Sequence, residues 1–134
     1  MINILLVSPE KSTFKELETA FQEKKITAKW TDSAQNALLM FSKEKFDLFI
    51  THEHLTDMTG RELIEKALVK NAMMNSVAAS TLSHDDFHKA YEGLGVLMQF
   101  PPAPGKEHVQ NLLNHLNRIT LIAGQQDKSR GEQD

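Results

Sequence analysis

FDLFITHEHLTDMTG, residues 46–60, is the stretch of the chain that decides its fold. Four of its first six residues are apolar, including three in a row, as in a strand that is buried on both faces of a parallel sheet. The residues that follow are mostly polar and end in Gly60, which is typical of a loop before a helix. The stretch therefore predicts a buried strand over 46–51, a loop over 52–60 and a helix over 61–68.

Short apolar runs alternate with longer amphipathic stretches along the rest of the chain. Apolar runs of strand length occur at residues 2–7, 26–31, 76–81 and 96–100. Amphipathic patterns of helix length occur at residues 11–25, 34–44, 85–92 and 106–122. Ser8 or Ser12 is expected to cap the first of these helices, and Asp32-Ser33 the second. Five strands that alternate with five helices predict an α/β domain, in which a doubly wound parallel sheet carries helices on both faces.

One compact domain and a polar tail account for the length of 134 residues. Apolar residues of the last helix recur at spacings of three and four and are expected on its inward face, namely Val109, Leu112, Leu113, Leu116 and Ile119. Gly124 is expected to end this helix. The residues after it are highly polar, so we expect a domain over 1–124 and a disordered tail over 125–134.

The composition of the chain excludes several classes of function. There is no cysteine, so disulfides, thiolate catalysis and cysteine-based zinc sites are excluded. The net charge of −3 is a poor match for nucleic acid, whose binding needs clustered lysine and arginine. No apolar run approaches the roughly 18 residues of a membrane span, and the N-terminus lacks the pattern of a signal peptide. We therefore expect a cytoplasmic globular protein without a nucleic-acid or membrane partner.

Polar side chains gather where the predicted strands end, and in a doubly wound sheet those carboxyl ends carry the functional groups. The ends fall at residues 8–10, 51–54, 80–82 and 100–101. A histidine-rich set lies at and beside two of them, made of His52, Glu53, His54, His84, Asp85, Asp86 and His88. His84 and His88 have the spacing of two metal ligands on a helix, but no H-E-x-x-H pattern accompanies them. We interpret the set as solvated loops, with a metal site as the alternative.

Two patches of the sequence carry a family resemblance. They are Phe46-Asp47-Leu48-Phe49-Ile50 with the following Asp57-Met58-Thr59-Gly60, and the residues from Gly93 to Pro101. The chain resembles the receiver domains of response regulators, the CheY-like proteins. In that family an apolar third strand ends in the phosphoacceptor aspartate, a D-M-D-G-like turn follows, and a glycine, the fifth strand and Lys-Pro come later. The resemblance covers residues 2–122 and implies a flavodoxin-like receiver fold in two-component signal transduction.

Receivers phosphorylate themselves on an aspartate, and the resemblance implies which residues stand at the positions concerned. An acidic pair after the first strand holds Mg²⁺, an aspartate ending the third strand is the nucleophile, and a hydroxyl and a lysine contact the phosphoryl oxygens. In this chain those positions hold, in order, Ser8 and Pro9, then His52, Ser80 (Thr81 in a register shifted by one) and Phe100. Glu10 is the only acid near the first pair, and Leu97 replaces the aromatic that couples phosphorylation to the output face. We expect a degenerate pocket that has lost its phosphotransfer chemistry.

The resemblance then implies a function that involves no catalysed reaction. We expect a pseudo-receiver that is not an enzyme, needs no cofactor or metal, and acts as a phosphorylation-independent protein-binding module. Its partner would be a histidine kinase, another regulator or a second copy of the chain. The family's partner surface corresponds to residues 85–121, with candidate contacts at Phe87, Tyr91, Leu94, Leu97 and Met98. Filling of the core is an equally open explanation for these side chains.

Two other functions stay open on the sequence alone. A metal or small-ligand sensor would use the vacated pocket around Glu10, His52, Ser80 and His84. Thermal stabilisation by a divalent ion would favour this function, because a ligand that binds only the native state raises the melting temperature. A still-active phosphotransfer protein would use an unexpected acceptor, Asp57 or His52.

Overall fold

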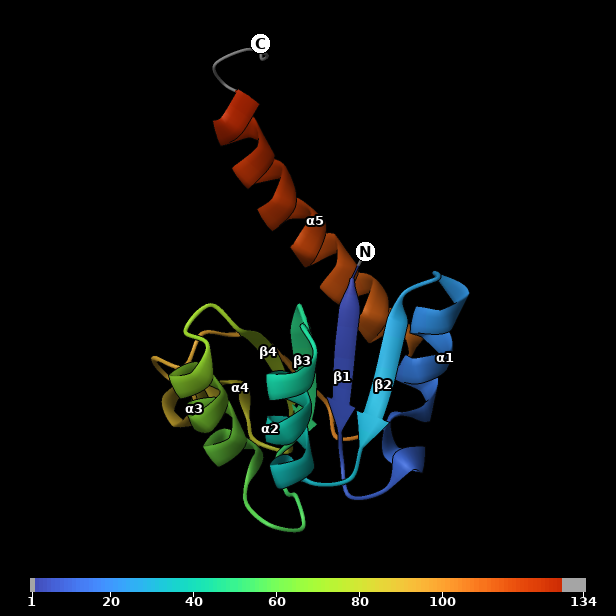
Figure 1. Cartoon of the computed structure of the whole chain (residues 1–134), viewed down its shortest axis with the longest axis vertical. Helices are drawn as coiled ribbons and strands as arrows, with labels where there is room; N and C mark the ends of the chain where they lie inside the picture. The colour runs from blue at the N-terminus through green and yellow to red at the C-terminus, as the bar shows by residue number, and fades with distance from the viewer. Residues whose placement is uncertain (1, 129–134) are drawn as a thin grey trace.

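A computed structural model of the chain describes residues 2–128, with side chains described for residues 2–117. Its five parallel strands form one sheet in the order β2-β1-β3-β4-β5 (Figure 1). The strands are β1 (Asn3–Val7), β2 (Thr27–Thr31), β3 (Leu48–His52), β4 (Asn75–Ala79) and β5 (Val96–Phe100). The chain winds outward from β1 in both directions, so the predicted doubly wound parallel sheet is confirmed.

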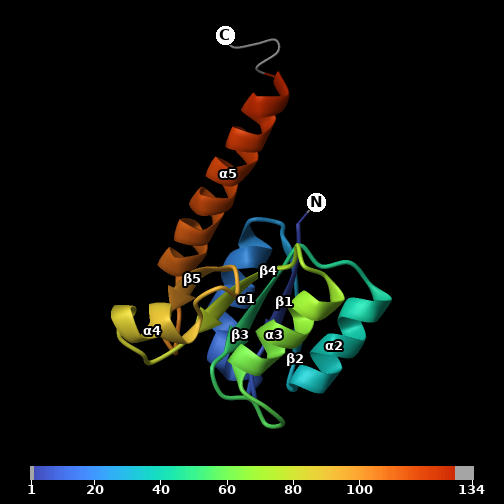
Figure 2. The same ribbon diagram turned by 90° about the vertical axis from the view of Figure 1, so that its left-hand side faces the viewer.

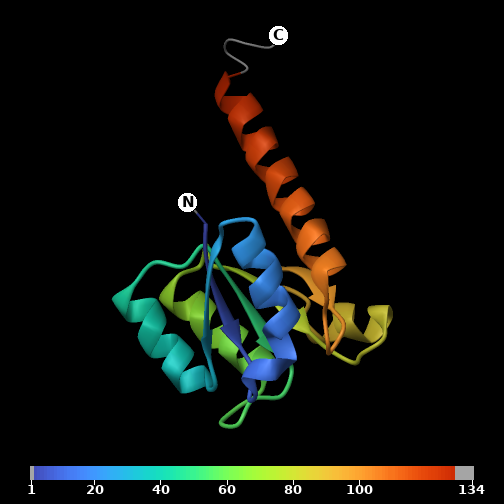
Figure 3. The same cartoon turned by 90° about the vertical axis from the view of Figure 1, so that its right-hand side faces the viewer.

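Helices cover both faces of this sheet. They are α1 (Lys15–Glu23), which follows a 3₁₀ turn η1 (Lys11–Phe14), then α2 (Ala34–Lys43), α3 (Gly60–Lys70), α4 (His84–Ala90) and α5 (Lys106–Lys128). α1 and α5 pack on one face, and α2, α3 and α4 pack on the other, as the two side views show (Figure 2, Figure 3). In the described residues, the prediction of five strands alternating with five α-helices is therefore confirmed.

The hydrophobic core forms two layers, one on each face of the sheet, because successive side chains of a strand point to opposite faces. In β1, the buried side chains of Ile4 and Leu6 join the layer that α1 and α5 cover. Leu5 and Val7, also buried, join the layer under α2 and α3. Cover on both faces explains why the central strands are apolar almost without interruption.

The first two helices begin in different ways. Ser33 caps α2 as predicted, because its side chain accepts a 3.1 Å hydrogen bond from the amide of Asn36. The chain enters α1 through η1, and neither element has a side-chain cap, so the prediction that Ser8 or Ser12 caps this helix is wrong. The hydroxyl of Ser8 instead donates to the carbonyl oxygen of Glu10 at 2.7 Å.

The inward face of α5 follows the predicted spacing in its first half. Val109 and Leu112 are buried in the layer that α5 shares with α1. Leu113 and Leu116 are partly buried and pack against the same layer. The side chain of Ile119, predicted on this face as well, lies outside the described side chains.

The second half of α5 rises away from the sheet (Figure 1). The helix continues to Lys128, so the prediction that Gly124 ends it is wrong. A glycine inside a helix costs only about 1 kcal/mol relative to alanine, which the neighbouring helix-forming residues can outweigh. Residues 129–134 of the predicted tail lie outside the described residues, and the domain boundary at residue 124 stays a prediction. No helix in the described part of the chain is both long and apolar enough to cross a membrane.

Candidate functional site

The carboxyl ends of β1, β3, β4 and β5 meet at one edge of the sheet, where the sequence places the candidate pocket. Parallel pairing sets His52 at the end of β3 beside Ala79 at the end of β4, and Ala79 beside Phe100 at the end of β5. β1 pairs with β3 up to the residue before Ser8. The residues that follow these strand ends therefore share one edge, as the topology predicts.

Ser8 ties the end of β1 to β2 through its hydroxyl. Besides its bond to the carbonyl oxygen of Glu10, this hydroxyl accepts a 3.0 Å hydrogen bond from the indole Nε1 of Trp30. The residue is fully buried, whereas Pro9 and Glu10 are exposed. Hard cations such as Mg²⁺ prefer carboxylate oxygens, and neither a buried serine with its partners satisfied nor a proline provides one.

His52 and Phe100 end their strands with side chains of very different character. His52 is half-buried, and its Nδ1 accepts a 3.3 Å hydrogen bond from the amide of His54. Phe100 is 1% exposed and belongs to the core layer under α1 and α5, with its ring centroid 5.5 Å from that of His108. The edge therefore presents an imidazole on β3, while the side chain that ends β5 is part of the core.

Ser80 keeps a hydroxyl after β4, but this hydroxyl is already engaged. It donates to Oε1 of Glu53 at 2.8 Å. Thr81 donates to Oε2 of Glu53 through its amide at 3.0 Å and its hydroxyl at 2.9 Å. Burial raises the pKa of Glu53, whose side chain is only 11% exposed, but the hydrogen bonds from Ser80 and Thr81 outweigh burial and the pKa lies below its ordinary value of 4.5. Glu53 is thus held as a carboxylate at the centre of the candidate site.

Glu53 is the site residue that the sequence analysis missed, because it appeared there only as a member of the histidine-rich set. The strand register pairs His52 with Ala79, so Glu53, which follows His52, falls near Ser80, which follows Ala79. The acid Glu53 directly after β3, and the hydroxyls of Ser80 and Thr81 directly after β4, were a signal in the sequence for this contact. Beyond the end of a strand, however, the alternation of side chains no longer fixes where a side chain points.

Asp57 anchors the loop between β3 and α3 to the start of α2. Its carboxylate accepts hydrogen bonds from the amides of Ala34 at 3.0 Å and Gln35 at 2.9 Å. Amides in the first turn of a helix have no partner within the helix, so this carboxylate acts as a cap supplied from a distant loop. Burial raises the pKa of Asp57, but the amide hydrogen bonds outweigh it and the pKa lies below its ordinary value of 3.8.

Replacing Asp57 with alanine is expected to lower the free energy of unfolding by about 1 kcal/mol, because two amides of α2 lose their acceptor. Urea denaturation measures the loss. Asp32→Ala is the matched control, since this exposed aspartate precedes the cap residue Ser33 and takes no part in the two bonds. Equal losses in the two variants would contradict the capping role of Asp57.

The four histidines of the histidine-rich set form two pairs. The ring centroids of His52 and His54 are 6.3 Å apart, and those of His84 and His88, on α4, are 4.6 Å apart. Among the described residues, no three histidine, aspartate or glutamate side chains lie together in position to hold a metal ion. The metal-site alternative therefore has no three-ligand cluster in this part of the chain.

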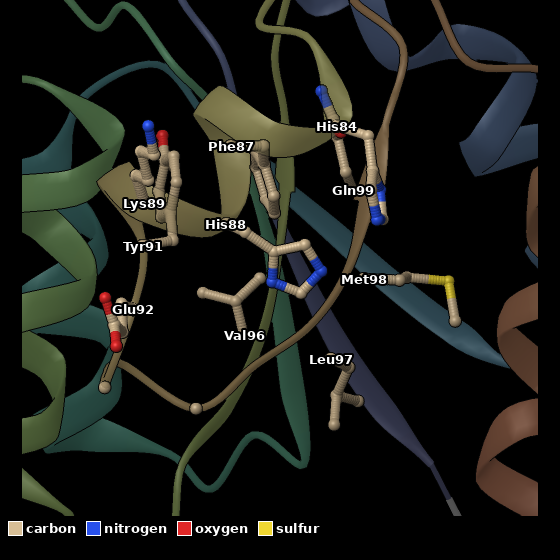
Figure 4. A pocket seen from close by; sticks show the side chains of 12 residues that line it. His84, Phe87, His88, Lys89, Tyr91, Glu92, Val96, Leu97, Met98 and Gln99 are labelled. Atoms are coloured by element: carbon tan, nitrogen blue, oxygen red, sulfur yellow. The ribbon is translucent and has the colours of Figure 1, made fainter.

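A groove of about 730 Å³ lies between α4 and β5 (Figure 4). Phe87 and Tyr91 line it, yet they stack with ring centroids 4.4 Å apart and are only 7% and 8% exposed, so both belong mainly to the core. Burial raises the pKa of the Tyr91 hydroxyl. Leu97 and Met98 line the groove as partly buried side chains, whereas Leu94 is partly buried but lies outside it. A role for these five residues in partner binding stays a prediction.

Comparison with known proteins rests on the three-dimensional structure. No protein-family model matches the chain, and no curated protein matches its sequence. A solved two-component response regulator from Clostridium difficile matches with a TM-score of 0.78 and 18% identity, over 89% of this chain and 98% of that chain. A receiver domain protein (CheY-like) from Methanospirillum hungatei JF-1 matches with a TM-score of 0.74 and 18% identity, over 96% of this chain and 98% of that chain. The chain has the receiver fold.

The receiver fold is also that of a third match, the signal receiver domain of an HD domain-containing protein from Pseudomonas fluorescens Pf-5. That match has a TM-score of 0.76 and 18% identity, over 92% of each chain. At such identities the likeness concerns the fold, and function has to be argued from the site. The edge that carries Ser8, His52, Ser80 and Phe100 is the edge at which sheets of this kind place their functional groups.

Proposed function

We propose that this chain is a receiver-type domain that no longer transfers phosphate and acts through protein binding alone, in two-component-type signalling. The observation that carries the proposal is the burial of Phe100, which is 1% exposed at the end of β5. Phosphoryl transfer depends on positive charge that neutralises the phosphoryl oxygens. A phenyl ring inside the core supplies none at the position where the receiver resemblance expects a lysine.

The other requirements of aspartyl phosphorylation fail at the same edge. A buried Ser8 and a proline stand in place of the acidic pair, so these two positions supply no carboxylate for Mg²⁺, and Glu10 is the only acid beside them. His52 stands in place of the nucleophilic aspartate. The surviving hydroxyl, that of Ser80, donates to Glu53. With metal ligands, nucleophile and cation lost together, we propose that the domain is not an enzyme.

The proposed binding surface is the α4–β5 face, defined as the groove between α4 and β5 together with its rim. Leu97 and Met98 contribute partly buried apolar side chains to the groove, and His84, His88 and Lys89 are exposed around it (Figure 4). An apolar centre with a polar rim is the usual composition of a protein–protein interface. The proposed partner is another signalling protein, a histidine kinase or a regulator, and a second copy of the chain is the alternative.

Incubation of the domain with a small phosphodonor and Mg²⁺ is expected to leave its intact mass unchanged, because nucleophile, metal ligands and cation are all missing. A receiver with the complete set of residues, treated in parallel, should gain one phosphate. Beryllofluoride, a mimic of aspartyl phosphate, should likewise leave the amide NMR signals around His52 and Ser80 in place. A gain of phosphate, or shifts that spread from these residues to α4, would overturn the proposal.

The sensor function that the sequence left open is not favoured by any contact in the described residues. His84 pairs with His88 on α4, and no three-ligand metal cluster is found among these residues. The hydroxyl of Ser80, which a ligand in the vacated pocket would need, already has Glu53 as its acceptor. We therefore do not propose a sensor function.

A further inference from the structure

Three hydrogen-bond donors converge on one carboxylate after the end of β4. The hydroxyl of Ser80 lies 2.8 Å from one oxygen of Glu53, and the amide and hydroxyl of Thr81 lie 3.0 Å and 2.9 Å from the other. Hydrogen bonds to an ionised acceptor are stronger than those between neutral groups. Two hydroxyls and an amide that point at one anion form an anion-binding cradle, and Glu53 occupies it.

Hydrogen bonds of the Glu53 backbone hold this residue beside the cradle. Its amide donates to the carbonyl oxygen of Ala79 at 2.9 Å, and its carbonyl oxygen accepts from the amide of Gly60 at 2.9 Å. Its side chain is only 11% exposed, although the neighbouring His54 is exposed. The carboxylate is therefore held in place by the ends of two strands and the start of α3.

The cradle also shapes the turn that leads into α4. The hydroxyl of Ser80 accepts a 3.0 Å hydrogen bond from the amide of Leu82. From β5, the side-chain amide of Gln99 donates to the carbonyl oxygen of Leu82 at 2.8 Å. Glu53 and Gln99 therefore hold the turn from opposite sides. Gln99 and His84, the first residue of α4, both line the groove (Figure 4).

We propose that Glu53 is a built-in anion that fills the cradle of Ser80 and Thr81 and thereby fixes the turn before α4 in one arrangement. The cradle is a site for a carboxylate or a small oxyanion, and the chain supplies its own ligand. A fixed turn would keep the α4–β5 face in a single state without phosphorylation. In this respect the inference deepens the proposed function and rests on it. The occupied cradle itself rests on the contacts described above.

Glu53→Ala empties the cradle and leaves its three donors without their acceptor. The variant is expected to melt roughly 5–10 °C below the parent protein. Acetate or inorganic phosphate should then bind the free donors and raise its melting temperature by roughly 2–4 °C, whereas sodium chloride at equal ionic strength should not. The NMR signals of the Thr81 and Leu82 amides should move in the variant and return toward their parent positions as either anion is added.

Glu10→Ala is the matched control, because it removes an exposed carboxylate from the same edge of the sheet. It should melt like the parent and show no response to acetate or phosphate. A Glu53→Ala variant that behaves like Glu10→Ala, or that no anion restores, overturns the proposal. If Glu53→Ala does not fold, Glu53→Gln keeps the shape of the side chain without its charge, and unchanged Thr81 and Leu82 amides in that variant overturn the proposal as well.

The proposed function and the anion cradle fail separately. A gain of phosphate by the parent protein overturns the proposed function and leaves the anion response of Glu53→Ala standing. A missing anion response in Glu53→Ala overturns the cradle and leaves the phosphodonor result unaffected. The two experiments together therefore identify which of the two inferences is in error.

Discussion

Replacing Phe100 with alanine should lower the free energy of unfolding by about 3–5 kcal/mol, the largest loss expected at the candidate site. The residue is 1% exposed and packs in the same core layer as Phe14, Val109 and Leu112. Its removal leaves a cavity that the surrounding side chains can fill only in part. Urea denaturation followed by far-ultraviolet circular dichroism measures the loss.

Two further variants at Phe100 separate the effect of size from that of polarity. Phe100→Leu keeps an apolar side chain and leaves a smaller cavity, so it should cost clearly less than alanine. Phe100→Lys restores the residue of the receiver family but buries an ammonium group among apolar side chains, so it should cost at least as much as alanine. A Phe100→Lys domain as stable as the parent would contradict the structural role of the ring. It would also show that the position can hold the lysine of the receiver family, which would weaken the argument from its loss.

Gly60→Ala should lower the free energy of unfolding by about 1–3 kcal/mol, although alanine normally stabilises a helix relative to glycine. A Cβ atom on Gly60 would overlap the carbonyl oxygen of His52 and lie 3.2 Å from the carbonyl carbon of His52 and from Cγ2 of Thr51. Most of these atoms belong to the backbone at the end of β3, which cannot turn aside as a side chain can. The amide of Gly60 also donates to the carbonyl oxygen of Glu53, so a displaced α3 would disturb the candidate site.

Gly105→Ala is the matched control for this substitution. A Cβ atom on Gly105 would meet Oε1 of Glu16 and Oε1 of Glu107, each at 3.1 Å and each at the end of a flexible side chain. The free energy of unfolding should therefore change by no more than about 0.5 kcal/mol. Similar losses at Gly60 and Gly105, measured by urea denaturation, would show that the carbonyl oxygen of His52 is not the cause.

The sheet was predictable from the sequence because each strand is a short apolar run and each connection contains an amphipathic helix. β5 has the predicted bounds, Val96–Phe100. The bounds of β3 and β4 differ from the predicted ones by up to two residues, and the larger errors lie at helix ends, where α1 begins after a 3₁₀ turn and α5 continues through Gly124. Such differences involve only about 1 kcal/mol of local preference, and tertiary packing decides them.

The candidate site was predictable in its location but only partly in its contacts. Parallel topology alone placed His52, Ser80 and Phe100 at one edge of the sheet, where the structure has them. The hydrogen bond from Ser80 to Glu53 joins residues 27 positions apart, and that from Ala34 to Asp57 joins residues 23 apart. Contacts of this kind depend on loop paths and side-chain rotamers, which no local period of the sequence encodes.

The hydrogen bond between Trp30 and Ser8 also gives the domain an optical property. Trp30 is the chain's one tryptophan, and its indole N–H donates to the hydroxyl of Ser8 at the end of β1. The emission wavelength of indole fluorescence depends on the polarity around the ring and on the hydrogen bonding of this N–H, which is the polar group of an otherwise apolar side chain. The emission spectrum of the unlabelled protein therefore reports on the edge of the sheet that carries the candidate site, so that a disturbance of Ser8 is visible without any added dye.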